Sequence, residues 1–328
     1  MREWARALVE SLQDRFRTRL EAASGETLTR VHWQRDGGRH GGGARDCAAE
    51  TPAFNRAAIN VSQVHYDDLP DRSLDSATAL STIIHPQNAL APSVHIHLSW
   101  TELRSGRGTW RLMADLNPAT PVASDTETFL SALRAVTPAQ FEEARAQGDR
   151  YFQIPALGRT RGVAHLYLES YSTADPEADR ALATRFGEVA VDTYARLFEA
   201  ARDRVPDASA RAAQLTYHTL YLFQVLTLDR GTTSGLLVHD QNDVGILGSL
   251  PSWIDRALLA SWMPRVDPVQ RPLVQKLVDT IPETGVVDDP TRAALAKAVR
   301  AFYEAHPEAL ALQASGGIIP PTVQQHRA

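Results

Sequence analysis

Two histidines stand one residue apart in a short apolar stretch, and this spacing decides which way they point. The stretch, residues 93–100, reads SVHIHLSW, which is typical of a β-strand. Side chains alternate across a strand, so His95 and His97 project from one face while Val94 and Ile96 take the other. Neutral imidazoles bind copper, iron or zinc, and an imidazole also serves as a proton donor. The pair predicts a polar cleft; the alternative is that each ring is structural.

Two further charged positions could contact a ligand. Asp229 could accept hydrogen bonds from N–H groups of a ligand, or it could cap a turn and pair with Arg230. Arg161 could bind a carboxylate, or it could form a surface ion pair contributing less than ~1 kcal/mol.

The elements that must hold these residues come in consecutive runs of strands and then of helices, which favours an antiparallel sheet covered by helices. A four-residue apolar period predicts a helix over 2–23, ending at Gly25. We expect a mobile loop at the glycine cluster 37–43 and a hairpin over 220–240 with Asp229 near its turn. The remaining elements expected are strands over 29–35, several between 55 and 120, and 163–170, and helices over 125–135, 138–148, 176–203, 207–218 and three more from 251 to about 304.

Composition narrows the class of protein. The 328 residues are 43% hydrophobic and 22% charged, as in a globular protein, with a net charge of −5. Neither a nucleic-acid partner nor an anionic membrane is expected from that charge. The single cysteine, Cys47, allows no intrachain disulfide and reads as a passive thiol. The charged N-terminus lacks the apolar core of a secretory signal, so we expect a cytoplasmic protein.

Six short pieces, in order and at matching spacing over residues 5–260, resemble the oxygen-dependent coproporphyrinogen III oxidase family. The family's G-V-N-x-S-x-V-H-G strand corresponds to 58–66 (AINVSQVHY), and its S-L-V-x-H-P-x-N to 81–88 (STIIHPQN). The other matches are 33–35 (WQR) with its glycine-rich loop, 151–152 (YF) with 161–162 (RG), 229–232 (DRGT) with 235–236 (GL), and 249–251 (SLP).

The resemblance implies an α+β fold, a large antiparallel sheet flanked on both faces by helices, and a homodimer. It implies one oxidase-like domain over 1–260, with 261–328 as a helical extension packed on it. The family uses molecular oxygen to convert two propionates of coproporphyrinogen III to vinyl groups, with no organic cofactor. His95 matches the family's proposed proton donor, Asp229 a residue facing the pyrrole N–H groups, and Ser81, Arg161 and Arg230 substrate-side positions.

Several of the family's substrate positions differ here. Its H-x-N-x-R ends at Ser99 where a carboxylate-binding arginine is expected, and a G-G-R loop reads His239-Asp240-Gln241. A substrate aspartate has either become Asn117 or moved to Asp115. Each lost charge-assisted bond would cost about 1.5–3 kcal/mol, which predicts an altered substrate.

Histidines have been gained at family positions that surround the substrate. His97 replaces an asparagine, and His165 and His239 replace glycines. We expect a copper or iron site made by His95 and His97 with His165 or His239, unless these are separate polar cleft residues.

The sequence thus predicts an oxygen-dependent oxidase or oxidative decarboxylase of an electron-rich pyrrole, indole or peptide side chain. Two alternatives stay open: authentic coproporphyrinogen III oxidase, and a non-catalytic family member that binds a tetrapyrrole or a metal.

Overall fold

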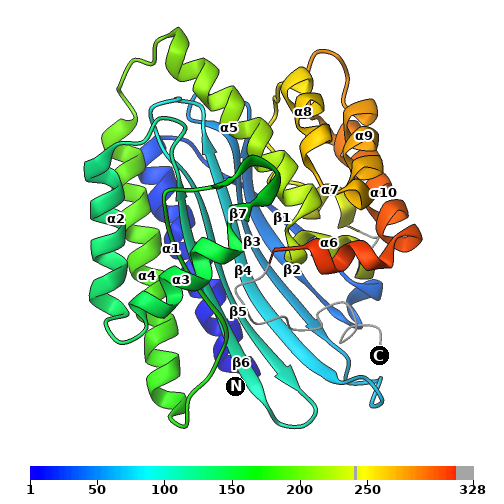
Figure 1. Cartoon of the computed structure of the whole chain (residues 1–328). Helices are drawn as coiled ribbons and strands as arrows, with labels where there is room; N and C mark the ends of the chain where they lie inside the picture. The colour runs from blue at the N-terminus through cyan, green and yellow to red at the C-terminus, as the bar shows by residue number, and fades with distance from the viewer. Residues whose placement is uncertain (240–241, 315–328) are drawn as a thin grey trace.

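A seven-stranded sheet forms the centre of the computed structural model, which describes residues 1–239 and 242–314 (Figure 1). Neighbouring strands all pair antiparallel, in the order β1-β2-β3-β4-β5-β6-β9. Their bounds are β1 Thr29–Gln34, β2 Gly41–Ala49, β3 Phe54–His65, β4 Leu74–Pro86, β5 Ser93–Leu103, β6 Gly108–Asn117 and β9 Ala164–Tyr171. A separate small hairpin joins β7 (Gln153–Ile154) to β8 (Arg159–Thr160).

Helices cover both faces of this sheet, as the resemblance implied (Figure 1). Three helices precede β9 in the chain: α1 Arg2–Ser24, α2 Ala123–Val136 and α3 Phe141–Tyr151. The helix α4 Pro176–Ala201 follows it directly. The later helices are α5 Ala208–Thr227, α6 Arg230–Val238, α7 Asp243–Ile246, α8 Arg256–Trp262, α9 Arg271–Thr280 and α10 Asp289–Ala305.

One face of the sheet packs into a hydrophobic core. Alternate residues of the central strands, such as Ile59, Leu80, Ile96 and Leu112, bury their side chains there against α1, α2 and α4. The helix expected over 2–23 is confirmed, and Gly25 ends it in the left-handed conformation. Because one face of each strand is committed to this core, the other face is left for polar residues.

A second core joins the opposite side of the sheet to α5 and the helices that follow it. It contains Ile83 and Met113 from the strands, Leu222 from α5 and Leu295 from α10. The C-terminal helices therefore share one hydrophobic cluster with this second face of the sheet rather than forming a core of their own.

The hairpin expected over 220–240 is wrong, because this stretch is helical in the described residues. α5 runs to Thr227 and α6 begins at Arg230. α5 is buried on nearly every side from Tyr217 onward, so its sequence shows no amphipathic period and resembles a strand. Asp229 lies at the junction and caps α6, its carboxylate accepting from the Thr232 N–H at 2.7 Å.

The glycine cluster expected as a loop over 37–43 is one only in its first part, where a short turn covers Asp36–Gly38, whereas strand β2 begins at Gly41. Gly41 has a φ of +93°, and a side chain there would overlap the carbonyl of Gln63 on β3. Glycine is required here by close strand approach and not by mobility.

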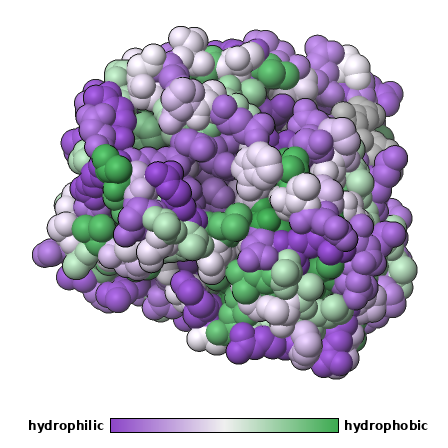
Figure 2. Space-filling view, turned by 90° about the horizontal axis from the view of Figure 1, so that it is seen from above, coloured by the Kyte–Doolittle hydropathy of each residue, from purple (hydrophilic) through white to green (hydrophobic). Residues whose placement is uncertain are grey.

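No helix of the described residues is long and apolar enough to cross a membrane. The face shown in Figure 2 carries mainly hydrophilic residues, with hydrophobic ones in small scattered groups.

Candidate functional site

The polar face of the sheet forms the floor of a cavity of about 590 Å³. This volume lies within the range that small-molecule sites occupy. Register places the floor residues in rows across the strands: Asn60 pairs with Ser81, Ser81 with His97, and His97 with Met113. The next row passes through Ser62, Ala79, Ser99 and Arg111.

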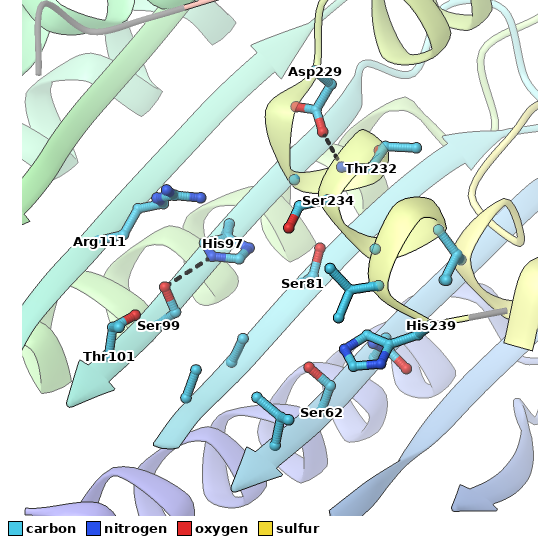
Figure 3. A pocket seen from close by; sticks show the side chains of 18 of the residues that line it. Ser62, Ser81, His97, Ser99, Thr101, Arg111, Asp229, Thr232, Ser234 and His239 are labelled. Carbon is cyan, nitrogen blue, oxygen red and sulfur yellow. Dashed lines mark hydrogen bonds between the residues drawn. The ribbon is translucent and has the colours of Figure 1, made fainter. Parts of the chain in front are cut away.

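The wall facing this floor comes from α6 and its flanks. Asp229, Thr232 and Ser234 project into the cavity from the start of α6, and His239 follows its last turn (Figure 3). The predicted partners His95, His97, Ser81, Ser99 and Asp229 therefore line one cavity, although Asp229 is distant from the others in sequence. The strand that carries the two histidines and the segment that begins with Asp229 therefore line opposite sides of this cavity.

His95 is held in a single protonation state by Arg161. The Arg161 Nη2 donates to His95 Nδ1 at 2.9 Å, so Nδ1 is an acceptor and the ring proton belongs to Nε2. Burial, reinforced by the charge of Arg161, lowers the pKa of His95 well below its usual value. The ring is therefore neutral near pH 7 and offers the cavity an N–H donor.

Arg161 belongs to a buried polar network. It is not among the described residues that line the cavity, and it does not form the surface ion pair that was the alternative expectation. Its guanidinium donates to Asp115 Oδ2 at 2.7 and 3.1 Å and to Gln224 Oε1 at 2.6 Å. Both Arg161 and Asp115 have fully buried side chains. With its groups committed to these partners, Arg161 supports His95 instead of binding a carboxylate of the substrate.

His165 extends the same network away from the cavity. Its Nε2 bonds Asp149 Oδ1 at 2.8 Å, and its Nδ1 lies 3.5 Å from Asp115 Oδ1. His165 is not one of the described residues that line the cavity. We expected His165 to bind a metal together with His95 and His97. This expectation is wrong, because both nitrogens of His165 face carboxylates outside the cavity.

His97 lies in the cavity beside Ser99 (Figure 3), its Nε2 3.1 Å from the Ser99 hydroxyl oxygen. Burial, with a smaller effect of Arg111, lowers the pKa of His97 to about 3, so this ring is also neutral. The part of the chain that the structure describes contains no group of three or more His, Cys, Asp or Glu side chains arranged to hold a metal ion. Copper or iron binding stays an untested prediction.

Asp229 caps a helix, which was one of the roles expected for it, and its carboxylate also faces the cavity. Its Oδ1 caps α6, while its Oδ2 accepts from the Tyr151 hydroxyl at 2.9 Å. The residue is 7% exposed and lines the cavity. A carboxylate has about four acceptor positions, so capacity is left for N–H groups of a ligand.

Three other predicted substrate-side residues have different surroundings. Asn117 is buried, and its amide donates to the backbone and side chain of Asp115. Arg230 forms an ion pair with Glu169, and neither Asn117 nor Arg230 is among the described residues of the cavity lining. Gln241 lies outside the described residues.

Four arginines that sequence reasoning did not select line the cavity: Arg35, Arg45, Arg107 and Arg111. Among the described residues of the lining, the acidic ones are Asp36 and Asp229. The signal for Arg111 was present, because it alternates with the buried Trp110 and Leu112 and must point to the polar face. The cavity is therefore lined by cationic groups despite the arginine lost at position 99.

Comparison with known proteins identifies the family of this chain. The sequence model of the family described as coproporphyrinogen III oxidase matches residues 5–281. The match extends beyond residue 260, where the motif resemblance ended.

Individual relatives give the same result. The oxygen-dependent coproporphyrinogen-III oxidase of Synechococcus sp. (strain CC9605) is 28% identical over 291 residues, covering 76% of this chain and 79% of that protein. The chloroplastic enzyme of Glycine max is 26% identical, covering 74% of this chain and 70% of its own. The Drosophila melanogaster enzyme is 24% identical, with 76% and 70% covered.

Proposed function

Because this chain belongs to the coproporphyrinogen III oxidase family, we propose that it is an oxygen-dependent oxidase acting on a carboxylate-bearing pyrrole. The observation that carries the proposal is the single cavity in which Asp229, His95 and four arginines meet. Arginines suit carboxylates, and an acceptor such as Asp229 suits pyrrole N–H groups.

These residues could support each step of the reaction. A propionate side chain loses CO₂ and a hydride equivalent to become a vinyl group, and O₂ takes up that hydride and one proton to give H₂O₂. Asp229 would hold the pyrrole N–H groups and stabilise the positive charge that develops on the ring. The neutral Nε2–H of His95 would donate a hydrogen bond to the reduced oxygen, because its pKa leaves no imidazolium at pH 7.

The arginine lining bears on which substrate is tested first. Loss of the arginine at position 99 argued for an altered substrate, but Arg35, Arg45, Arg107 and Arg111 provide cations that the sequence argument had not counted. Coproporphyrinogen III is therefore the first substrate to test, followed by pyrroles and indoles that carry fewer carboxylates.

The experiment is turnover of coproporphyrinogen III by purified protein under air, with an anaerobic reaction as the control. We expect vinyl products, CO₂ and H₂O₂ to form in equal amounts per vinyl group, and only when oxygen is present. Absence of turnover with coproporphyrinogen III and with every smaller carboxylated pyrrole would overturn the proposal. Binding without oxygen uptake would instead support a non-catalytic tetrapyrrole carrier.

The proposal includes a homodimer in the cytoplasm that uses no organic cofactor. The edge strand β1 is largely exposed, which leaves a hydrogen-bonding surface open to a second copy. Light scattering of the purified chain tests the dimer, and a monomeric mass at micromolar concentration would contradict it.

A further inference from the structure

Arg111 lies on the floor of the cavity, directly across the sheet from Ser99. The register pairs the two residues on β6 and β5, which places their Cβ atoms ~4.5–5.5 Å apart. Both side chains project from the polar face, and Figure 3 shows the guanidinium beside His97 and above Ser99. The Arg111 side chain is only 19% exposed, so its charge is held in a largely desolvated position.

The charge of Arg111 is poorly matched by the residues around it. Its ion-pair contact among the described residues is Glu169 Oε1 at 3.8 Å, which is longer than a hydrogen bond. The same Glu169 oxygen accepts from the Tyr167 hydroxyl at 2.9 Å and forms the ion pair with Arg230. One carboxylate is thus shared by two guanidinium groups, which leaves a surplus positive charge facing the cavity.

Burying a cation without a full partner costs free energy unless a ligand provides the missing anion. A planar guanidinium binds a carboxylate through two parallel N–H bonds, which a point charge cannot do. Ser99, opposite on β5, provides a hydroxyl that could donate to the same carboxylate.

We propose that Arg111 and Ser99 form a carboxylate subsite that anchors one acidic side chain of the substrate above β5 and β6. The inference rests on the proposed function and deepens it by fixing an orientation. One carboxylate lies over the floor at Arg111, and the pyrrole N–H groups face Asp229 in the wall from α6. Arg111 then selects for substrates that have an acidic side chain at this end.

The test is equilibrium binding of two stable probes, coproporphyrin III and its tetramethyl ester, followed by porphyrin fluorescence. The wild-type chain should prefer the free acid. Arg111→Gln should weaken binding of the acid about 10- to 100-fold and change binding of the ester less than about threefold. Arg111→Lys keeps the charge but loses the planar fork, so an intermediate affinity is expected.

The matched control is Arg6→Gln, which removes one positive charge from an exposed position on α1, behind the opposite face of the sheet. It should leave the affinity for both probes unchanged. Thermal melting of each variant separates loss of binding from loss of folding, and Arg111→Lys retains the test if Arg111→Gln fails to fold.

Three results would overturn the subsite: equal affinity of wild type for acid and ester, unchanged acid binding in Arg111→Gln, or equal weakening of both probes. The test needs neither oxygen nor turnover. Acid preference that depends on Arg111, without any oxidase activity, would reject the proposed function and keep the subsite. Turnover of coproporphyrinogen III that does not depend on Arg111 would do the reverse.

Discussion

The Arg161 guanidinium donates to His95 Nδ1 at 2.9 Å, although the two residues are 66 positions apart in the chain. Arg161 is itself fixed by Asp115, which in turn faces His165. The orientation and the protonation state of one cavity histidine therefore depend on a buried chain of charges that reaches the exposed carboxylate of Asp149.

His95 should act as a neutral hydrogen-bond donor at every pH from about 5.5 to 8.5, because burial and Arg161 lower its pKa well below 6.5. His95→Ala should lower kcat/KM by about 10²- to 10³-fold, the usual effect of removing one such donor. We expect the ratio of wild-type to variant activity to stay constant across this pH range. A ratio that changed tenfold with a midpoint near pH 6.5 would instead identify an imidazolium as the acting form.

Removing Arg161 should destabilise the protein by about 3–5 kcal/mol, because the buried Asp115 carboxylate loses the guanidinium that neutralises it. Urea unfolding of Arg161→Met measures this loss. The double variant with Asp115→Asn removes the orphaned charge and should recover part of the stability. A loss under about 1 kcal/mol in the single variant would show that Asp115 is neutral or solvated.

Two substitutions of Asp229 separate its cap from its charge. Asparagine is as good an N-cap as aspartate, so Asp229→Asn should keep the stability of the protein while lowering kcat through loss of the anion. Asp229→Ala should lower activity as well and also cost about 1 kcal/mol of stability. Full activity in Asp229→Asn would restrict this residue to its structural role.

The stabilising effect of His165 should decline as the pH rises. Burial opposes its charge, but the carboxylates of Asp115 and Asp149 that its two nitrogens face outweigh burial and raise the pKa of His165. A raised pKa in the folded state adds stability that is complete below the unfolded value near 6.5 and is lost as the pH passes the folded value. The pKa of Asp115 is lowered to about 2, against the effect of burial, chiefly by Arg161, so Asp115 does not titrate in this window.

Unfolding free energies of wild type and His165→Gln at pH 5.5, 7 and 9 measure this effect. We expect the difference between the two proteins to be largest at pH 5.5. A difference that increases with pH would contradict the assignment of a protonated ring. Asp149→Asn, at an exposed carboxylate, should reproduce a smaller part of the same trend.

Gly162→Ala should disturb the network without touching the cavity lining. A methyl group there would overlap Asp115 Oδ1 and lie 2.7 Å from the Leu116 carbonyl oxygen. Overpacking of this kind costs about 1–3 kcal/mol, and the shift of Asp115 should also lower activity through Arg161 and His95. Thermal melting and a turnover assay together check this, and a variant with unchanged stability and activity would show that Asp115 has room to move.

Features with a local period could be predicted from the sequence. Alternation placed His95 and His97 on the polar face and Ile96 on the core face, and a helical period located α1 up to Gly25. These features depend only on residues a few positions apart, whose side chains must repeat with the backbone. Short motifs in order also indicated the family, although α5 and α6 were misread because a helix buried on most sides has no polar stripe.

Only the tertiary structure decided which charges meet. The register of β5 against β6 places Arg111 opposite Ser99, and a loop after β8 brings Arg161 to Asp115 and His95 instead of to the cavity. Whether a charged side chain binds a ligand or another residue depends on partners tens of positions away and on burial that strand pairing creates. Neither is encoded in the local sequence pattern, because the free energy of a buried charge is set by its three-dimensional neighbours.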